Sequence, residues 1–320
     1  MSGFLARLAG RCARRPVLVI AGWLAAAGLL TFAASSFGGE LDSNIAIPGT
    51  DSQRVSELIG SDFSARSGIE ANVVIGAPAP GERTLKQQAA MDSMDEVLLD
   101  LDGILAVDET ISSRSGDVVI IPVRFDPETS SRATVDALIE SGAELRESGL
   151  DVHFGGELLS TFEAEEGSTA EIVGLIVAAI VLLVAFGSVY AMAVPIGTAL
   201  VGLACGLAAV DLAARSLPVP EWAPLLGSMI GIGVGIDYAL FLVSRHQENL
   251  LAGHDVQASI RIAGSTAGTS VLFAGSTVVV SILGLSIAGL PQLTAAAVTT
   301  SVIVVIAVAA AITVVPAALS

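Results

Sequence analysis

A single acidic residue in the middle of a long apolar run constrains this chain more than any other feature. The run extends from Glu221 to Glu248 (EWAPLLGSMIGIGVGIDYALFLVSRHQE), and its one internal acid is Asp237. About 20 apolar residues in a helix cross the hydrocarbon of a bilayer, and an ionisable side chain inside such a span costs roughly 3 kcal/mol or more. We therefore expect Asp237 to face a protein neighbour or a wet cavity rather than lipid.

Glycines recur every four residues in the same run, at Gly227, Gly231 and Gly235. Successive residues of a helix are offset by about 100°, so these three glycines share one face, against which a neighbouring backbone can pack closely. Gly233 precedes Asp237 by one turn on another face. The pattern predicts that the glycine face packs against a neighbouring helix and that Asp237 lies on a different side.

Two interpretations of Asp237 stay open at this point. A membrane carboxyl group can remain protonated as a structural hydrogen-bonding group that hydroxyls on the next helix satisfy. Alternatively, a carboxyl group held away from water favours its neutral form, and can load and release a proton as its access to water changes. Tyr238 could add a phenol donor, although adjacent side chains point in different directions. We favour the proton-binding interpretation.

Composition and charge indicate a membrane protein with one solvated segment. Of the 320 residues, 53% are hydrophobic and 15% charged, with a mean hydropathy of +0.76. Residues 37–170 hold 26 of the 32 acids and only 8 of the 15 bases, so the net charge of −17 belongs to this segment. That acidity argues against nucleic acid as a partner. The two cysteines and three histidines suggest no disulfide, metal site or cofactor.

The apolar segments predict six membrane spans. A basic tail, 1–16, precedes the first span, 17–36, and places the N-terminus in the cytoplasm by the positive-inside rule. Residues 37–170 then lie outside the cytoplasm, and 171–320 form five more spans. These spans are expected at about 171–189, 192–213, 222–244, 266–288 and 293–316. The predicted protein is multi-pass, with its bundle in the plasma (inner) membrane.

The connections between the spans carry further expectations. We expect a tight turn around Gly187, Ser188 and Pro195, and a short helix along the inner surface between the fourth and fifth spans, over about 250–260. His246 lies at the same rim, where a solvated histidine is the ordinary outcome.

The pattern within 37–170 predicts an extracytoplasmic α+β subdomain of βαββαβ, ferredoxin-like topology. Strands are expected at 71–76, 104–108, 117–125 and 151–155, and helices at 82–101 and 131–147, with a further helix over about 50–63. The residues that alternate as in a half-buried strand are Val119, Ile121, Val123 and Phe125. Pro122 falls in a central strand, where its missing N–H predicts either another register or a bulge.

Three stretches of the sequence resemble a known family. These are PGTDS at the start of the acidic segment, GIGVGIDYALFLVSR in the fourth span and AGTSVLFAGSTVVVSILGL in the fifth. Together with the order of one span, a porter segment and five spans, they resemble the MMPL family of the resistance-nodulation-division (RND) superfamily of membrane transporters. The resemblance implies that Asp237 and Tyr238 belong to a proton relay that couples the proton-motive force to export of lipids or other hydrophobic molecules. It also implies nearby hydroxyls, carried here by Ser276 and Thr277, of which Thr277 matches better.

The sequence departs from the family pattern in several respects, two of which bear on the predicted relay. Position 274, often a hydroxyl residue in relatives, is Ala274. Family members commonly contain two such halves with a second Asp-Tyr pair, whereas this chain has one. We therefore expect either that two copies associate, or that this chain is half of a longer transporter and is inactive alone.

The function predicted is proton-driven export of a lipid or other hydrophobic molecule, with no enzymatic activity. An intramembrane aspartyl protease would need a GxGD sequence and a second membrane carboxyl group, and Asp211 is poorly placed to share a proton with Asp237. The sequence contains no glycine- and lysine-containing phosphate-binding loop, so no motif indicates ATP as the energy source. The alternative is a non-transporting membrane anchor whose porter segment binds lipid or a partner.

Overall fold

The computed structural model describes residues 2–39, 41, 54, 68–78, 82–126, 129–163 and 168–320, with the backbone alone at 161–163 and 168–171. The helix expected over about 50–63 lies outside the described residues. The chain divides into two compact units, Met1–Pro48 with Ala170–Ser320, and Gly49–Thr169. Each unit has its own buried core.

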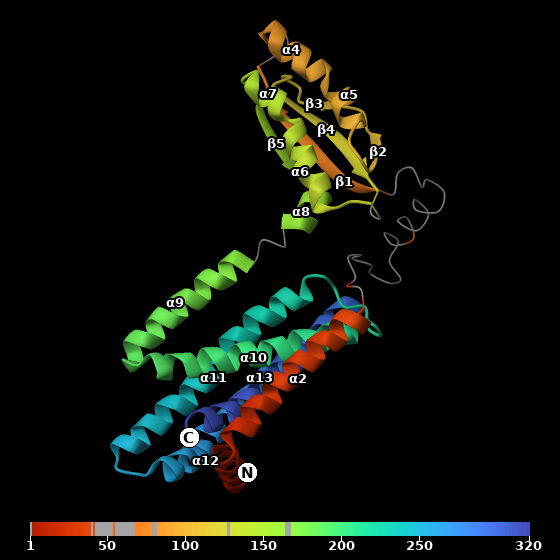
Figure 1. The fold of residues 1–320 in the computed structure, drawn as a ribbon. Helices are drawn as coiled ribbons and strands as arrows, with labels where there is room; N and C mark the ends of the chain where they lie inside the picture. The colour runs from red at the N-terminus through yellow and green to blue at the C-terminus, as the bar shows by residue number, and fades with distance from the viewer. Residues whose placement is uncertain are drawn as a thin grey trace. The chain divides into compact units, whose positions relative to one another are not determined.

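The smaller unit is a layer of helices on an antiparallel sheet (Figure 1). Its strands have the order β2-β4-β1-β5, with β3 also paired to β4, which is the order of the split βαβ sandwich. The strands are β1 Ile69–Gly76, β2 Ile104–Val107, β3 Ile111–Ser112, β4 Val118–Phe125 and β5 Asp151–Gly155. The helices are α4 Leu85–Asp92, α5 Met94–Leu99, α6 Arg132–Ser141, α7 Ala143–Glu147 and α8 Glu157–Glu163. The predicted α+β topology is confirmed, with β3 as an unpredicted addition.

The predicted alternation in β4 is confirmed, because Val119, Ile121, Val123 and Phe125 are all buried. Pro122 keeps its place in this strand, opposite Asn72 of β1. Its carbonyl accepts a hydrogen bond from the Asp108 N–H, just beyond the end of β2. The register irregularity lies in β2, between Ile104 and Ala106, so Pro122 is tolerated where the neighbouring strand has already ended.

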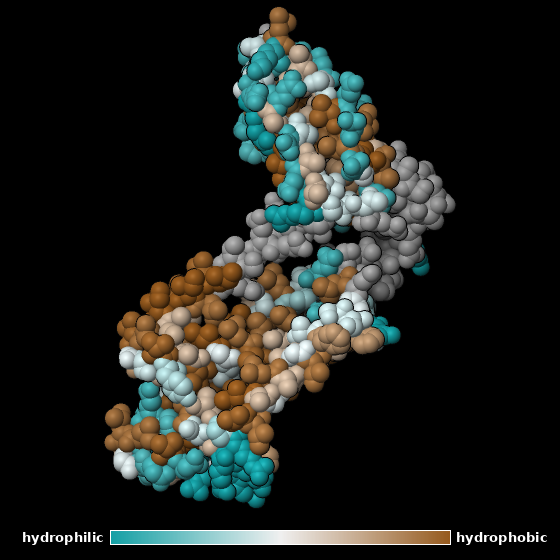
Figure 2. Space-filling model, in the orientation of Figure 1, coloured by the Kyte–Doolittle hydropathy of each residue, from teal (hydrophilic) through white to brown (hydrophobic). Residues whose placement is uncertain are grey.

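The larger unit is a bundle of helices, most of which are long and apolar. They are α1 Ser2–Arg14, α2 Pro16–Phe37, α9 Ser168–Phe186, α10 Val189–Ala214, α11 Ala223–Leu251, α12 Val256–Leu283 with the 3₁₀ helix η3 Gly284–Ala288, and α13 Pro291–Ala318. Within the described residues, five helices are long and apolar enough to cross a membrane, namely α2, α10, α11, α12 with η3, and α13. The predicted span at 171–189 corresponds to α9, whose described apolar part, Ile172–Phe186, is shorter. Figure 2 shows the hydrophobic surface that these helices expose.

Two expectations about the connections are corrected, and the basic tail has a structure that was not predicted. Gly187 makes the turn between α9 and α10 with a φ of +63°, a conformation that favours glycine, but Pro195 lies inside α10. No separate surface helix follows the fourth span, because α11 continues to Leu251 and α12 begins at Val256. The basic tail is itself a helix, α1, whose apolar side packs on α12 and α13.

The glycine face of α11 lies against two neighbouring helices. A Cβ atom at Gly227 would lie 2.3 Å from Cδ1 of Ile303, and one at Gly231 would lie 2.7 Å from its Cγ2. Gly206 of α10 approaches the same side chain, since its Cβ would lie 3.1 Å from Cγ1 of Ile303. A Cβ at Gly235 would lie 3.0 Å from that of Ala199 in α10. Ile303 of α13 therefore occupies a space that three missing side chains leave open.

Replacing Gly231 by alanine tests this packing. We expect Gly231→Ala to lower the stability of the detergent-solubilised protein by about 1–3 kcal/mol, because the new methyl group overlaps the branched methyl of Ile303. Thermal unfolding followed by circular dichroism measures the change. Gly233→Ala is the matched control, since a Cβ there meets nothing within 4 Å. Equal effects of the two substitutions, or no recovery when Ile303→Ala is combined with Gly231→Ala, would contradict the packing argument.

Candidate functional site

Asp237 lies halfway along α11, on the outer side of the bundle. The helix runs for 29 residues from Ala223 to Leu251, so the carboxyl group is about 21 Å from either end. Asp237 is exposed, and it forms no hydrogen bond or ion pair with any residue that the structure describes. An acid at mid-depth in an apolar bundle is thus left without a partner from the described part of its chain.

Helix geometry explains why Asp237 faces outward. Gly235, two residues earlier, is held against Ala199, and two positions correspond to a rotation of about 200°. The residues that share the face of Asp237 follow at intervals of four, Gly233 before it and Phe241 after it, and both are exposed. This stripe, Gly233-Asp237-Phe241 together with Arg245, is the Asp237 face.

Tyr238 points the other way, into the bundle. A Cβ at Gly275 of α12 would lie 3.5 Å from Cε2 of the tyrosine ring. The ring also packs beside the cluster of Val271, Val304 and Val308 from α12 and α13. The two residues of the Asp-Tyr pair therefore have opposite environments, one exposed and one between helices.

A polar groove continues the Asp237 face toward the turn between α11 and α12. Its volume is about 280 Å³, and its lining includes Phe241, Arg245, Glu248, Thr266 and Ser270. Arg245 Nη1 donates to Glu248 Oε2 over 2.7 Å. The other Ser and Thr hydroxyls of α12 donate to backbone carbonyls or, at Ser259, also contact a histidine ring. Ser270 alone on this fully described helix forms no hydrogen bond, which leaves its hydroxyl available to a solvent molecule or ligand in the groove.

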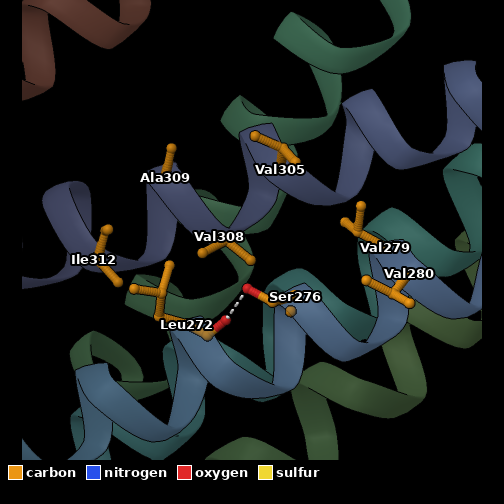
Figure 3. A pocket seen from close by; sticks show the side chains of 9 residues that line it. Leu272, Ser276, Val279, Val280, Val305, Val308, Ala309 and Ile312 are labelled. Atoms are coloured by element: carbon orange, nitrogen blue, oxygen red, sulfur yellow. Dashed lines mark hydrogen bonds between the residues drawn. The ribbon is translucent and has the colours of Figure 1, made fainter. Parts of the chain in front are cut away.

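The two predicted hydroxyls, Ser276 and Thr277, lie on different sides of α12. Ser276 lines an apolar groove of about 330 Å³ between α12 and α13, with Val308 and Ile312 opposite it (Figure 3). Its hydroxyl donates to the Leu272 carbonyl over 2.7 Å. Thr277 follows Ser270 by seven residues, about two turns, and so shares the side that borders the polar groove.

Neither predicted hydroxyl bonds to Asp237. Thr277 Oγ1 donates to the Phe273 carbonyl over 3.0 Å, within its own helix. The structure therefore places Thr277 on the side of α12 next to the Asp237 face and Ser276 on the side next to α13.

Asp211, the other membrane acid considered, lies far from Asp237 in depth. It is in the last turn of α10, and the Gly39 N–H after α2 donates to its backbone carbonyl over 3.0 Å. Its depth below the helix end is about 5 Å, compared with about 21 Å for Asp237. Two carboxyl groups at such different depths do not share a proton.

Comparison with known proteins establishes the family. The model of the MMPL family matches residues 44–320. The chain belongs to the MMPL family. The resemblance found in the sequence is thereby confirmed, including its assignment to a family of membrane transporters.

Curated relatives are longer than this MMPL-family chain. Membrane protein YdfJ of Bacillus subtilis (strain 168) is 32% identical over 337 residues, which cover 100% of this chain and 45% of YdfJ. The trehalose monomycolate exporter MmpL3 of Mycolicibacterium smegmatis is 34% identical over 141 residues, or 44% of this chain and 14% of MmpL3. The crystal structure of SecDF in super-membrane-facing form aligns with a TM-score of 0.49 and 16% identity, over 96% of this chain and 38% of SecDF. The chain spans less than half the length of each.

The sequence argument missed two members of this MMPL site, Ser270 and the Arg245–Glu248 pair. The sequence contained a signal for the pair, because Arg245 and Glu248 are three residues apart, a spacing at which opposite charges on a helix can form an ion pair. No local signal marks Ser270. Several other hydroxyls lie nearby in α12, and only the contacts show which of them has no partner.

His246 is buried rather than solvated. It is 5% exposed, and its Nδ1 lies 2.8 Å from the Ser259 hydroxyl across the turn between α11 and α12. The Ser259 hydroxyl donates its one proton to the His246 carbonyl over 2.8 Å. In the bond between the two side chains, the ring N–H of His246 is therefore the donor and the hydroxyl oxygen accepts. Asn249 reaches the Ser259 carbonyl over 3.4 Å. These bonds join the C-terminal end of α11 to the N-terminal end of α12.

Removing the Ser259 hydroxyl should destabilise this end of the bundle. We expect Ser259→Ala to cost about 1–3 kcal/mol, because it leaves the buried His246 ring nitrogen without a partner. Thermal unfolding in detergent measures the loss. Ser265→Ala is the control, since that hydroxyl bonds only to the Ile262 carbonyl of its own helix. A loss no larger than that of the control would contradict the role of the histidine contact.

Proposed function

We propose that this chain is one half of a proton-driven exporter of a lipid or other hydrophobic molecule, with Asp237 as its proton carrier. In this proposal α9 completes a set of six spans in the plasma membrane, the N-terminus is cytoplasmic and the α+β unit is extracytoplasmic. The observation that carries the proposal is the position of Asp237, exposed and unpaired at the middle of an apolar helix. The name of MmpL3, an exporter of trehalose monomycolate, supports a lipidic substrate.

The exposed carboxyl group requires a partner surface. Facing lipid, an ionised Asp237 would cost several kcal/mol, and no residue of the described chain compensates that cost. A second copy, or a second half such as the remaining length of YdfJ provides, could supply a polar or wet surface opposite the Asp237 face. Such a surface would turn the outward acid into an interior one.

In the proposed mechanism, Asp237 exchanges its proton with the hydroxyls and the polar groove around it. Asp237 gains a proton when the site opens to one side of the membrane and releases it when the site opens to the other. Tyr238 and Thr277 provide hydroxyls at about the same depth, with Ser276 farther round α12. The polar groove past Phe241, with Ser270 and the Arg245–Glu248 pair, leads from Asp237 toward the α11–α12 end of the bundle.

Neutralising Asp237 removes its desolvation cost, which allows α11 to shift against the facing element. The two connections to the α+β unit follow α2 and precede α9, so a shift in the bundle reaches that unit through these helices. Movement of the unit would then carry the hydrophobic substrate outward.

A second candidate is a membrane-anchored protein that binds lipid or a partner without transport. The observation that favours it is the separate core of the α+β unit, which is compact without contributions from the bundle. Under this alternative the spans only hold the unit at the membrane, and Asp237 stays permanently protonated.

Asp237→Asn separates the two candidates. We expect proton flux driven by an imposed pH gradient in proteoliposomes of phosphatidylethanolamine and phosphatidylglycerol to fall roughly a hundredfold, because the amide cannot exchange a proton. A pH-sensitive dye trapped inside the vesicles reports the flux. Equal fluxes for the wild type and the variant, at equal protein content and above the flux of protein-free vesicles, would end the proton-carrier proposal.

The two predicted relay hydroxyls of α12, Ser276 and Thr277, provide a matched pair of variants. Thr277→Val should lower the same flux more than Ser276→Ala does, since Thr277 borders the Asp237 side and Ser276 the groove next to α13. Protein yield and thermal stability of each variant are measured alongside, so that misfolding is recognised. The reverse order of effects would place the relay on the other side of α12.

Cross-linking tests whether a second copy covers the Asp237 face. In a background with Cys12→Ala and Cys205→Ala, we expect Gly233→Cys to form a disulfide-linked dimer in membranes, with twice the 32.3 kDa mass of the chain. Val184→Cys, exposed on α9, is the control and should stay monomeric. A Gly233→Cys protein that remains monomeric under the same oxidant would exclude the symmetric copy and leave a separate second half as the partner.

A further inference from the structure

The outer side of α1 carries a row of arginines on a rigid support. Arg7, Arg11 and Arg14 are spaced by four and three residues, so they share one face of the helix, and Arg15 follows at its end. All four are exposed. The opposite side of α1, which includes Leu5 and Ala9, is buried against the bundle.

A fifth arginine joins this row from a distant part of the sequence. A Cβ at Gly10 would lie 3.1 Å from Cγ and 3.2 Å from Cδ of Arg261, so the stem of Arg261 crosses α1 at its glycine. The two helices are pressed together there, since a Cβ at Gly264 of α12 would lie 2.6 Å from that of Ala9. Packing therefore fixes Arg261, which is exposed, beside the arginines of α1.

The described residues provide no counter-charge for these five arginines. Arg7 Nε donates to the Gly3 carbonyl and Arg261 Nε to the Gln257 carbonyl, and none of the five forms an ion pair within the described chain. Two acids lie at this end of the bundle. Glu248 is paired with Arg245, and Asp255 accepts the Ala258 N–H that begins α12. The cluster thus keeps an unbalanced positive charge.

We propose that Arg7, Arg11, Arg14, Arg15 and Arg261 form an arginine face that binds the phosphate headgroups of anionic phospholipids. The guanidinium group presents several N–H donors in a plane, which suits two oxygens of one phosphate. The location favours lipid over a soluble anion, because Pro16 directly after this face begins α2, a 22-residue apolar helix in which no residue is fully buried. A helix joined in this way to a membrane span lies at the depth of the headgroups. Figure 2 shows the hydrophilic surface at the end of the bundle where the N-terminus lies.

Convergence of α1 with Arg261 distinguishes this surface from a basic tail. A flexible tail with four arginines attracts anionic lipid only through its charge, and a distant residue would not matter to it. In this fold Arg261 is placed by the contacts of Gly10 and Gly264, so five guanidinium groups are held on one surface before lipid arrives.

Lipid binding by the purified 320-residue chain in detergent tests the proposal. Native mass spectrometry and thermal unfolding are followed as phosphatidylglycerol or phosphatidylcholine is added to the micelles. We expect phosphatidylglycerol to bind at least tenfold more tightly, and high salt to weaken its binding. Equal binding of the two lipids, or binding of phosphatidylglycerol that salt does not change, would overturn the proposal.

Three variants locate the binding surface. Arg11→Gln and Arg261→Gln should each weaken phosphatidylglycerol binding several-fold, and the double variant at least tenfold. Arg215→Gln, at the exposed end of α10, is the matched control and should leave binding unchanged. All three substitutions are at exposed side chains, and unfolding without lipid checks that the fold is kept. If Arg11→Gln weakens binding while Arg261→Gln does not, the basic tail alone is responsible and the converged face is refuted.

Discussion

The contact between Ile303 and the glycines around it sets the geometry of the bundle. In a membrane, lipid tails are as apolar as the helix surfaces, so helices associate mainly through close packing of surfaces with complementary shapes. Ile303 of α13 fills the space left by Gly206 in α10 and by Gly227 and Gly231 in α11. This contact fixes which side of α11 faces inward.

Once that side is fixed, the direction of Asp237 follows from the helix. Its carboxyl group is carried to the outer surface about halfway along the helix, while Tyr238 is carried inward beside Gly275. A single chain of this length therefore presents an acid where lipid would be the wrong neighbour. An acid that needs a facing element is also an acid whose surroundings change when that element moves.

Charge is distributed along the chain in a way that suits two different aqueous surroundings. Residues 37–170 carry 26 of the 32 acids, whereas Arg7, Arg11, Arg14 and Arg15 precede the first apolar helix. The acids cover a unit with its own core, while the arginines lie on a helix packed against the bundle. This separation of negative and positive charge is the basis of the proposed membrane orientation.

The sequence alone determined the features that depend on local pattern. The alternation in β4 and the helical periods around it predicted the α+β topology. The apolar runs located the long helices, although α11 continues seven residues beyond its predicted span and α12 begins ten residues before its own. The four-residue spacing of Gly227, Gly231 and Gly235 also predicted that they share a face other than that of Asp237. Each of these follows from the period of one element, which the sequence contains in full.

Only the tertiary structure decided what depends on contacts between elements. Ser276 and Thr277 are adjacent in sequence and both exposed, yet Ser276 lines the apolar groove between α12 and α13 and Thr277 does not. His246 is buried because Ser259 meets it across a turn, and Arg261 reaches α1 because Gly10 has no side chain to exclude it. Such placements arise from the fit of distant helices, so no local pattern in the sequence records them.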